Sequence, residues 1–307
     1  MDGRIRELQY AIATDPGDAE ARSQLRALLR RVADLGDRLA WNQADSSSQD
    51  LVIEAVAYQL QPGFSFLGTE RYEAGGAAHR IAAFRHEASG VRLHLIPGGR
   101  YERGGRREPH RTNELPLAEV HTRPFLLGRT PLLQREWERL PGRDARRFRG
   151  AELPIDGVTW EDARAWLRGA GLRLPSEAEW EFACRAGTES AFFWGEEPNS
   201  AYAWFGTGGA SWETQPPELH AAYPNAFGLV DLAGNLAEWC EDHYVGSYHG
   251  APCDGTPRRE AKGDLRVVRG GDTYNSSSHC RSASRNLAAR DVQAGGIGLR
   301  VAASVEW

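Results

Sequence analysis

Apolar residues recur at helical spacing in the first forty residues of the chain. One helical face is formed by residues 5–12 and another by residues 25–35. The turn TDPGD at 14–18 separates them, because Pro ends the first helix and Asp18 suits the N-cap of the next. The pattern predicts a helical hairpin, and the polar run NQADSSSQD at 42–50 predicts a linker after it. Such a hairpin suits the docking of a partner or packing on its own chain.

Alternation of apolar and polar residues replaces the helical spacing farther along. The segments HRIAAFRHE at 79–87 and VRLHLIPGG at 91–99 alternate as half-buried strands do. This change of period divides the chain into three predicted regions. They are a helical hairpin with its linker at 1–48, a short β-rich extension at 49–90 and a larger domain at 91–307.

Two further helices have clear start signals inside the larger domain. Thr159 precedes WEDARAWLRGA, whose first turn carries two acidic residues that favour a helix N-terminus. Ser176 and Glu179 form a capping box at the start of the second helix, and Gly187 is expected to end it. Beyond Gly187 the pattern shows only short strands, turns and aromatic residues. The prediction is an α+β domain with two helices, small sheets and extensive loops.

Composition and charge restrict the classes of partner. The 307 residues are 41% hydrophobic and 26% charged, as in ordinary globular proteins. A formal net charge of −5 gives no general attraction to nucleic acid or membranes. The sequence has no run of apolar residues long enough to cross a membrane, and its start lacks the apolar stretch of a secretory signal. We therefore expect a cytoplasmic protein without nucleic-acid or membrane partners.

Four cysteines, at 184, 240, 253 and 280, are too sparse for a disulfide scaffold. No C-x-x-C pair is present, which argues against a zinc ribbon. Reduced, mostly buried thiols are the expectation for such cysteines. The 34 Gly and 10 Trp predict many tight turns and bulky core anchors.

Five motifs in the larger domain occur in a characteristic order. They are PIDGVTWEDARAWL, LRLPSEAEWEFACRAG, PNAFGLVDLAGNLAEWCED, RVVRGGDTYNSSSHCRSASRN and GGIGLRVA. Together they resemble the sulfatase-modifying-factor family, also called the formylglycine-generating-enzyme family, over about residues 91–307. The resemblance implies a variant of the C-type lectin fold, with two helices beside small, twisted sheets.

The resemblance also implies a calcium site in the turn after Val230. Its ligands here would be the side chains of Asp231 and Glu238 with the carbonyls of Gly234 and Leu236. Oxygen ligands suit a hard cation such as Ca²⁺. The alternative is that both carboxylates cap turns and pair with arginines such as Arg281 or Arg285.

The family's enzymes oxidise a cysteine of a client protein to formylglycine, with copper held by two thiolates five positions apart after a Gly-Gly pair. Two soft sulfur ligands suit Cu(I). Counting forward from Gly270-Gly271 places Asn275 and Cys280 at these positions. Counting back from GIGLR places Asp272 and Ser277 there. Neither count gives two cysteines, so the resemblance implies a member that lacks the catalytic pair, argues against copper and leaves Cys280 a structural role.

The remaining prediction is a non-catalytic module that recognises a protein or a small-molecule ligand through the loop after Gly270-Gly271. Tyr, Ser and Asn in that loop suit adaptable contacts. The expected contact residues are Tyr274, Asn275, Ser276, Ser278 and His279, with Trp204 and Trp212.

Two alternatives stay open at this point. The first is a divergent metal-dependent oxidase of the formylglycine-generating type, acting on a thiol or a peptide, in which Cys280 is a metal ligand or a nucleophile. The second is a regulatory or targeting subunit that docks on a partner through the N-terminal helices.

Overall fold

The computed structural model describes residues 38–106, 111–144, 146–206, 213–259 and 263–305, with isolated positions between 7 and 24. Most of the predicted N-terminal hairpin, including residues 25–37, lies outside the described residues, as does Trp212. Within the described ranges, no helix has both the length and the apolar character needed to span a membrane.

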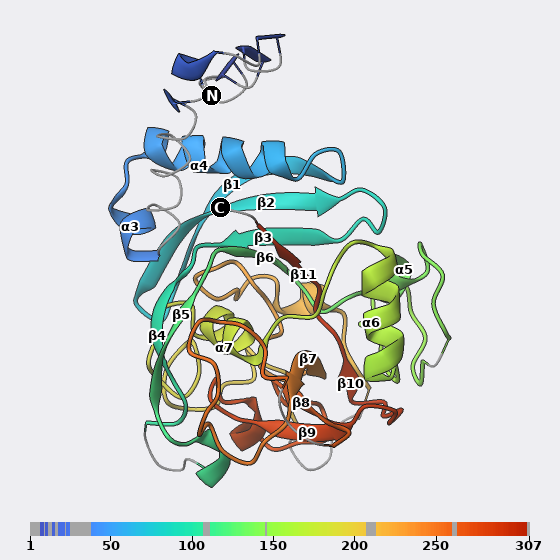
Figure 1. Ribbon diagram of the computed structural model, residues 1–307. Helices are drawn as coiled ribbons and strands as arrows, with labels where there is room; N and C mark the ends of the chain where they lie inside the picture. Colours follow the sequence, from blue (N-terminus) through green and yellow to red (C-terminus); the bar gives the residue numbers. More distant parts are fainter. Residues whose placement is uncertain are drawn as a thin grey trace.

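The polar run at 42–50 contains the start of a helix. Helix α3 (Arg38–Gln43) is followed by α4 (Ser46–Gln59), and the Asp45 side chain caps α4 by accepting from the Ser48 amide at 2.7 Å. Val52, Ile53 and Val56 of α4 are buried in the same apolar cluster as strand residues of the larger domain. Helix α4 therefore packs over strands β1 and β2, as Figure 1 shows.

The two alternating segments become neighbouring strands of one sheet. The five-stranded sheet has the order β1-β2-β3-β6-β11. Its strands are β1 (Phe64–Ala74), β2 (Ala77–His86), β3 (Arg92–Ile96), β6 (Phe125–Gly128) and β11 (Ala302–Ser304). Residues 64–86 thus extend a sheet whose other strands come from the larger domain.

Smaller elements complete the fold. A four-stranded sheet has the order β10-β7-β8-β9, and β4 pairs with β5. These strands are β4 (Gly99–Arg103), β5 (Ala118–Thr122), β7 (Ala237–His243), β8 (Leu265–Arg269), β9 (Asn286–Ala289) and β10 (Ile297–Gly298). Short helical turns are α5 (Gln134–Trp137), η1 (Thr112–Glu114), η2 (Pro217–His220) and η3 (Ser277–Cys280).

Both helices predicted for the larger domain are present with their predicted caps. In α6 (Trp160–Gly169), Thr159 Oγ1 accepts from the Asp162 amide at 3.0 Å. In α7 (Glu177–Arg185), Ser176 and Glu179 form the expected capping box. Helix α7 ends at Arg185 and is capped by Ala186, which is left-handed with φ 46° and lies one residue before the predicted glycine. The α+β prediction is confirmed, with α7 in the centre of the molecule (Figure 1).

Candidate functional site

The loop after β8, residues 270–279, leads the chain from β8 to the buried Cys280. Gly270 and Gly271 have φ values of 98° and 71°. A Cβ on Gly271 would lie 2.8 Å from Sγ of Cys280, so this position requires glycine for both conformation and space. Asp272 then accepts from the Tyr274 amide at 2.9 Å and from the Asn275 side chain. The loop has a defined conformation built from its own polar groups.

The predicted contact residues of this loop differ in exposure. Ser276 is exposed, whereas Tyr274, Asn275, Ser278 and His279 are half-buried. Ser276 Oγ lies 2.9 Å from Ser278 Oγ and 3.4 Å from Nδ1 of His279. The loop therefore presents a small hydroxyl surface centred on Ser276.

His279 is held by an arginine that the sequence analysis did not single out. Arg111 Nη2 donates to Nε2 of His279 at 2.9 Å, which requires a neutral ring with its proton on Nδ1. Burial and the nearby Arg111 charge both lower the pKa of His279. The ring is therefore a neutral hydrogen-bonding group at physiological pH.

Trp204 lies between the loop and the turn that follows Val230. Its carbonyl accepts from the backbone amide of Asn235 at 2.7 Å, and Trp204 forms an isolated parallel β-bridge with Gly234. Two residues later, the Gly206 amide donates to the Asn275 carbonyl at 2.8 Å. The structure thus brings Trp204 next to the predicted loop, whereas the position of Trp212 lies outside the described residues.

An aromatic cluster adjoins the loop, and its members at 192–194 and 223 are not among the contact residues predicted from the sequence. Trp194 stacks on Phe192 at 4.8 Å and on Tyr202 at 5.0 Å, and Tyr202 meets the exposed Tyr223 at 5.1 Å. The segment connects to the loop because the Ser282 amide donates to the Ala191 carbonyl at 2.8 Å. The run AFFW at 191–194 is the sequence signal that indicates this cluster.

Cys280 lies underneath the loop in an apolar environment. It is 1% exposed and clusters with Phe192, Ala203 and Ala233. Burial, followed by the negative charge of Asp272, raises the pKa of the Cys280 thiol to about 12. The thiol is therefore protonated at physiological pH, whereas metal binding and nucleophilic attack both use the thiolate.

Three buried arginines hold the chain that follows the loop. Arg281 pairs with Glu114 at 2.6 Å, and Arg285 pairs with Glu177 at 2.6 Å. Arg269 contacts Glu181 at 2.6 Å and donates to the carbonyls of residues 282–284. The side chains of these three ion pairs are buried and joined by several hydrogen bonds. The pairs therefore fix the base of the loop.

The carboxylates of the implied calcium site are occupied by other donors. Glu238 accepts from Arg300 at 2.7 Å and from the Trp180 ring nitrogen at 2.7 Å. Asp231 has Oδ1 2.8 Å from Nδ1 of His220, and its Oδ2 accepts from the side-chain Nδ2 of Asn235 at 2.8 Å. Glu238 thus pairs with an arginine, as the alternative expected, but the partner is Arg300. Arg281 and Arg285 pair instead with Glu114 and Glu177. As arranged, these side chains do not fit a calcium ion, which would have to displace the Arg300 or His220 contact.

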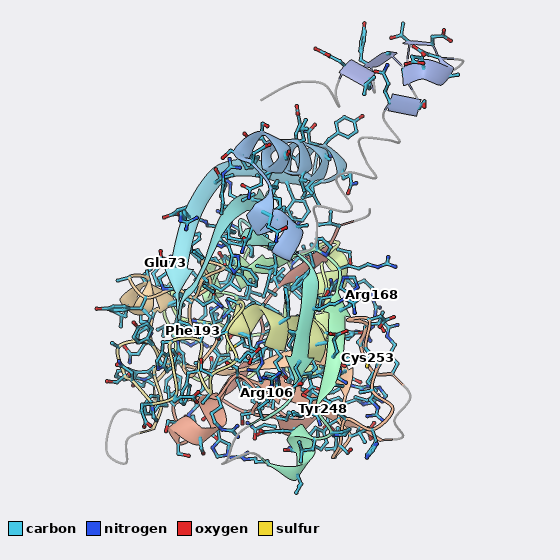
Figure 2. The ribbon with its side chains drawn as sticks, turned by 90° about the vertical axis from the view of Figure 1, so that its left-hand side faces the viewer. Glu73, Arg106, Arg168, Phe193, Tyr248 and Cys253 are labelled. Carbon is cyan, nitrogen blue, oxygen red and sulfur yellow. The ribbon has the colours of Figure 1, made fainter. Side chains whose placement is uncertain are left out.

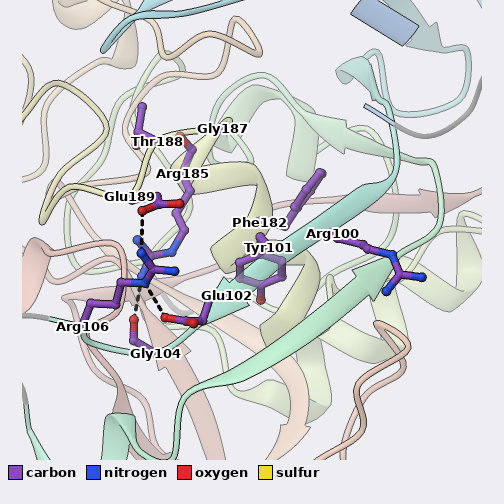
Figure 3. A pocket seen from close by; sticks show the side chains of 10 residues that line it. All are labelled: Arg100, Tyr101, Glu102, Gly104, Arg106, Phe182, Arg185, Gly187, Thr188 and Glu189. Carbon is purple, nitrogen blue, oxygen red and sulfur yellow. Dashed lines mark hydrogen bonds and ion pairs between the residues drawn. The ribbon is translucent and has the colours of Figure 1, made fainter. Parts of the chain in front are cut away.

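A narrow hollow lies between β4 and the end of α7 and is lined by residues within 100–106 and 182–189. It has a volume of about 80 Å³. Arg106 spans it, contacting Glu102 and, at 2.7 Å, Glu189, while Arg185 donates to the Gly104 carbonyl (Figure 3). These ion pairs line the hollow and leave little free space in it, so the candidate site is the surface formed by the loop, Trp204 and the aromatic cluster.

A family model and curated relatives agree on the family to which this chain is similar. The family model of the sulfatase-modifying factor enzyme 1-like domain matches residues 81–305. The formylglycine-generating enzyme of Streptomyces coelicolor is 33% identical over 191 residues, covering 54% of this chain and 60% of that enzyme. The Bos taurus protein named inactive C-alpha-formylglycine-generating enzyme 2 is 33% identical over 144 residues, or 43% of each chain. The chain thus spans no more than 60% of the length of these curated relatives.

Among solved structures, PvdO from Pseudomonas aeruginosa is similar over 72% of this chain and 97% of its own. The TM-score is 0.64, and the sequence identity is 27%. This similarity confirms the predicted C-type-lectin-like form of the α+β fold.

Proposed function

Because the chain belongs to the sulfatase-modifying factor enzyme 1-like domain family, we propose that it is a non-catalytic member. In this proposal it lacks the copper-binding cysteine pair and recognises a protein or a small-molecule ligand through residues 272–279. The observation that carries the proposal is the position of Cys280, which is buried below the loop and not presented on it.

The chemistry of the thiols supports the absence of a copper centre. A two-coordinate Cu(I) site needs two thiolates. In either alignment of the loop at most one cysteine occupies the required positions, because Asn275, Asp272 and Ser277 fill the others. Cys184, a buried thiol on α7, donates to Ser282 Oγ at 3.5 Å, and burial raises its pKa to about 11. Neither Cys184 nor Cys280 is a ready thiolate.

The arrangement of the candidate site supports recognition. Ser276 stands at the surface on a loop whose two ends are held, one by Gly270-Gly271 and the other by the Arg281–Glu114 pair. A pre-formed loop loses little conformational entropy on binding. Hydroxyl, amide and aromatic groups together offer hydrogen bonds and stacking area. A relative that is itself named inactive is consistent with non-catalytic members of this family.

Affinity capture with quantitative mass spectrometry tests the proposal. The bait is the full chain, compared with Ser276→Arg, which adds bulk at the exposed tip, and with Cys280→Ala, which removes the thiol. We expect a partner or ligand that is retained by Cys280→Ala and lost by Ser276→Arg. Capture that depends on Cys280 and tolerates Ser276→Arg would instead support an oxidase that uses the thiol.

A further inference from the structure

A second hollow lies on another side of the molecule, between α6 and the four-stranded sheet. It has a volume of about 390 Å³. Figure 2 places Arg168, which lines it, and Phe193, beside the aromatic cluster, on opposite margins of the molecule. Five of its lining residues are arginines, namely Arg164, Arg168, Arg259, Arg266 and Arg290.

Arg266 is the unusual member of this set. It lies on β8, is only 5% exposed and lines the hollow. Its Nε and Nη1 atoms are buried and have no hydrogen-bond partner among the described residues. A buried guanidinium without a counter-charge is strongly unfavourable unless a ligand supplies one. An apolar side chain at this position would avoid that cost, so the unpartnered guanidinium is the observation that favours an anionic ligand here.

The ring of Trp160 holds the guanidinium of Arg266 in place, while two of the guanidinium nitrogens have no hydrogen-bond partner among the described residues. Its guanidinium carbon lies 4.1 Å from the ring centroid of Trp160, and that of Arg164 lies 4.6 Å from the same ring. The Trp160 ring is fixed because its nitrogen donates to the Cys240 carbonyl at 2.9 Å. Burial is the main reason that the pKa of Arg266 is lowered; the charge of Arg290 lowers it further, and Glu241 acts in the opposite direction. A bound anion would act in the same direction as Glu241.

The carboxylates nearby are fewer than the arginines. Glu241 lies 3.2 Å from Arg164 and 3.8 Å from Arg259. Glu161 and Asp264 both pair with Arg290, at 3.3 Å and 3.2 Å. Five guanidinium groups thus face three carboxylates among the described residues, an excess of two positive charges (5 − 3). The chain as a whole carries −5, so this excess is a local feature.

We propose that this hollow binds a doubly charged tetrahedral oxyanion, a phosphate or sulfate group, with Arg266 at its base and Arg168 at its rim. The charge of such an ion matches the local excess, and the fork of a guanidinium matches two of its oxygens. An adjoining groove of about 890 Å³ shares Arg164, Arg168 and Arg259 with the hollow. The groove leaves room for the organic part of an esterified phosphate or sulfate. The proposal involves different residues from loop 272–279 and does not depend on its function.

Calorimetric titration of inorganic phosphate into the full chain at low ionic strength tests the site. We expect one saturable site per chain. Arg168→Gln, at an exposed position, and Arg266→Gln each weaken it about tenfold or more, as loss of a hydrogen bond to a charged group does. Arg85→Gln is the matched control, because Arg85 is exposed on β2 and its loss changes the net charge equally. This control keeps the affinity of the unmodified chain.

A titration with a second ligand identifies the ligand class, and the surface variant provides a test that does not depend on the folding of Arg266→Gln. O-phosphoserine that binds more tightly than inorganic phosphate assigns the site to an esterified group, and weaker binding assigns it to the free ion. Arg168 is exposed, so Arg168→Gln should fold and still tests phosphate binding if Arg266→Gln does not fold. The proposal is overturned by the absence of saturable phosphate or sulfate binding. Acetate binding as tightly as phosphate, or an equal loss in Arg85→Gln, also overturns it.

Discussion

Arg281 and Glu114 lie 167 positions apart in the chain and form a buried, two-point ion pair. The Nη2–Oε1 and Nη1–Oε2 distances are 2.6 Å and 3.1 Å. Arg281 follows Cys280 directly, and its Nε also donates to the Ser278 carbonyl at 3.2 Å. The pair therefore connects the short η1 turn to the end of the loop that we propose as the recognition surface.

Breaking this pair should strongly destabilise the protein. Glu114→Gln or Arg281→Met leaves one buried charged group without its partner, so each should lower the free energy of unfolding by about 3–5 kcal/mol. Urea denaturation measures this change. Arg100→Gln is the control because the Arg100–Glu119 pair is 65% exposed on both sides, and its loss should cost less than about 1 kcal/mol. Equal effects at the two pairs would refute the role assigned to Arg281.

Thiol reactivity should separate one cysteine from the other three. Cys253 is exposed, whereas Cys184, Cys240 and Cys280 are buried. Burial raises the pKa of each of these three thiols, to about 11 for Cys184 and about 12 for Cys280. With an aromatic disulfide reagent, one thiol should react in the native protein and four in urea. Cys253→Ser should abolish the native reaction, and a second fast thiol in the native state would contradict the burial of Cys280.

The His220–Asp231 contact predicts a pH dependence of stability. The hydrogen bond to Asp231 is the main reason that the pKa of His220 is raised. A raised pKa means that the folded state binds the proton more tightly, so this stabilisation is complete below the unfolded-state pKa of about 6.5. It is lost as the pH rises through the higher folded-state value. The stability difference between the unmodified chain and His220→Gln should therefore shrink as the pH rises from about 6.5 through the higher folded-state pKa, measured by urea denaturation. A difference that stays constant over this range would argue against the contact.

Local features of the fold could be predicted from the sequence because their causes are local. Thr159 and Ser176 cap α6 and α7 as their spacing from acidic residues indicates. The polar run at 42–50 was predicted to be a linker because of its composition, whereas it contains the end of α3 and the start of α4. Asp45 caps a helix there, and Gln49 is buried, donating to the Trp41 carbonyl at 2.7 Å. The helix is also held by the burial of Val52, Ile53 and Val56 against strands of the larger domain, which composition alone does not reveal.

The site was only partly predictable for the same reason. The Gly-Gly pair locates the loop, and the positive φ angles explain why glycine is needed. The partners of its residues come from distant segments, such as Arg111 for His279 and Gly206 for Asn275. Glu238 likewise pairs with Arg300, which lies 62 positions away. Spacing within a motif gives no information on such pairs, because the sheet topology determines them.

A competitive Cu(I) titration of the reduced chain tests the central claim most directly. The claim is that Cys280 is a buried structural thiol beneath a recognition loop. The titration compares the unmodified chain with Cys280→Ala, and elemental analysis gives the stoichiometry. The account predicts no tight site that depends on Cys280. Tight one-to-one binding that disappears in Cys280→Ala would contradict it and identify a divergent copper oxidase.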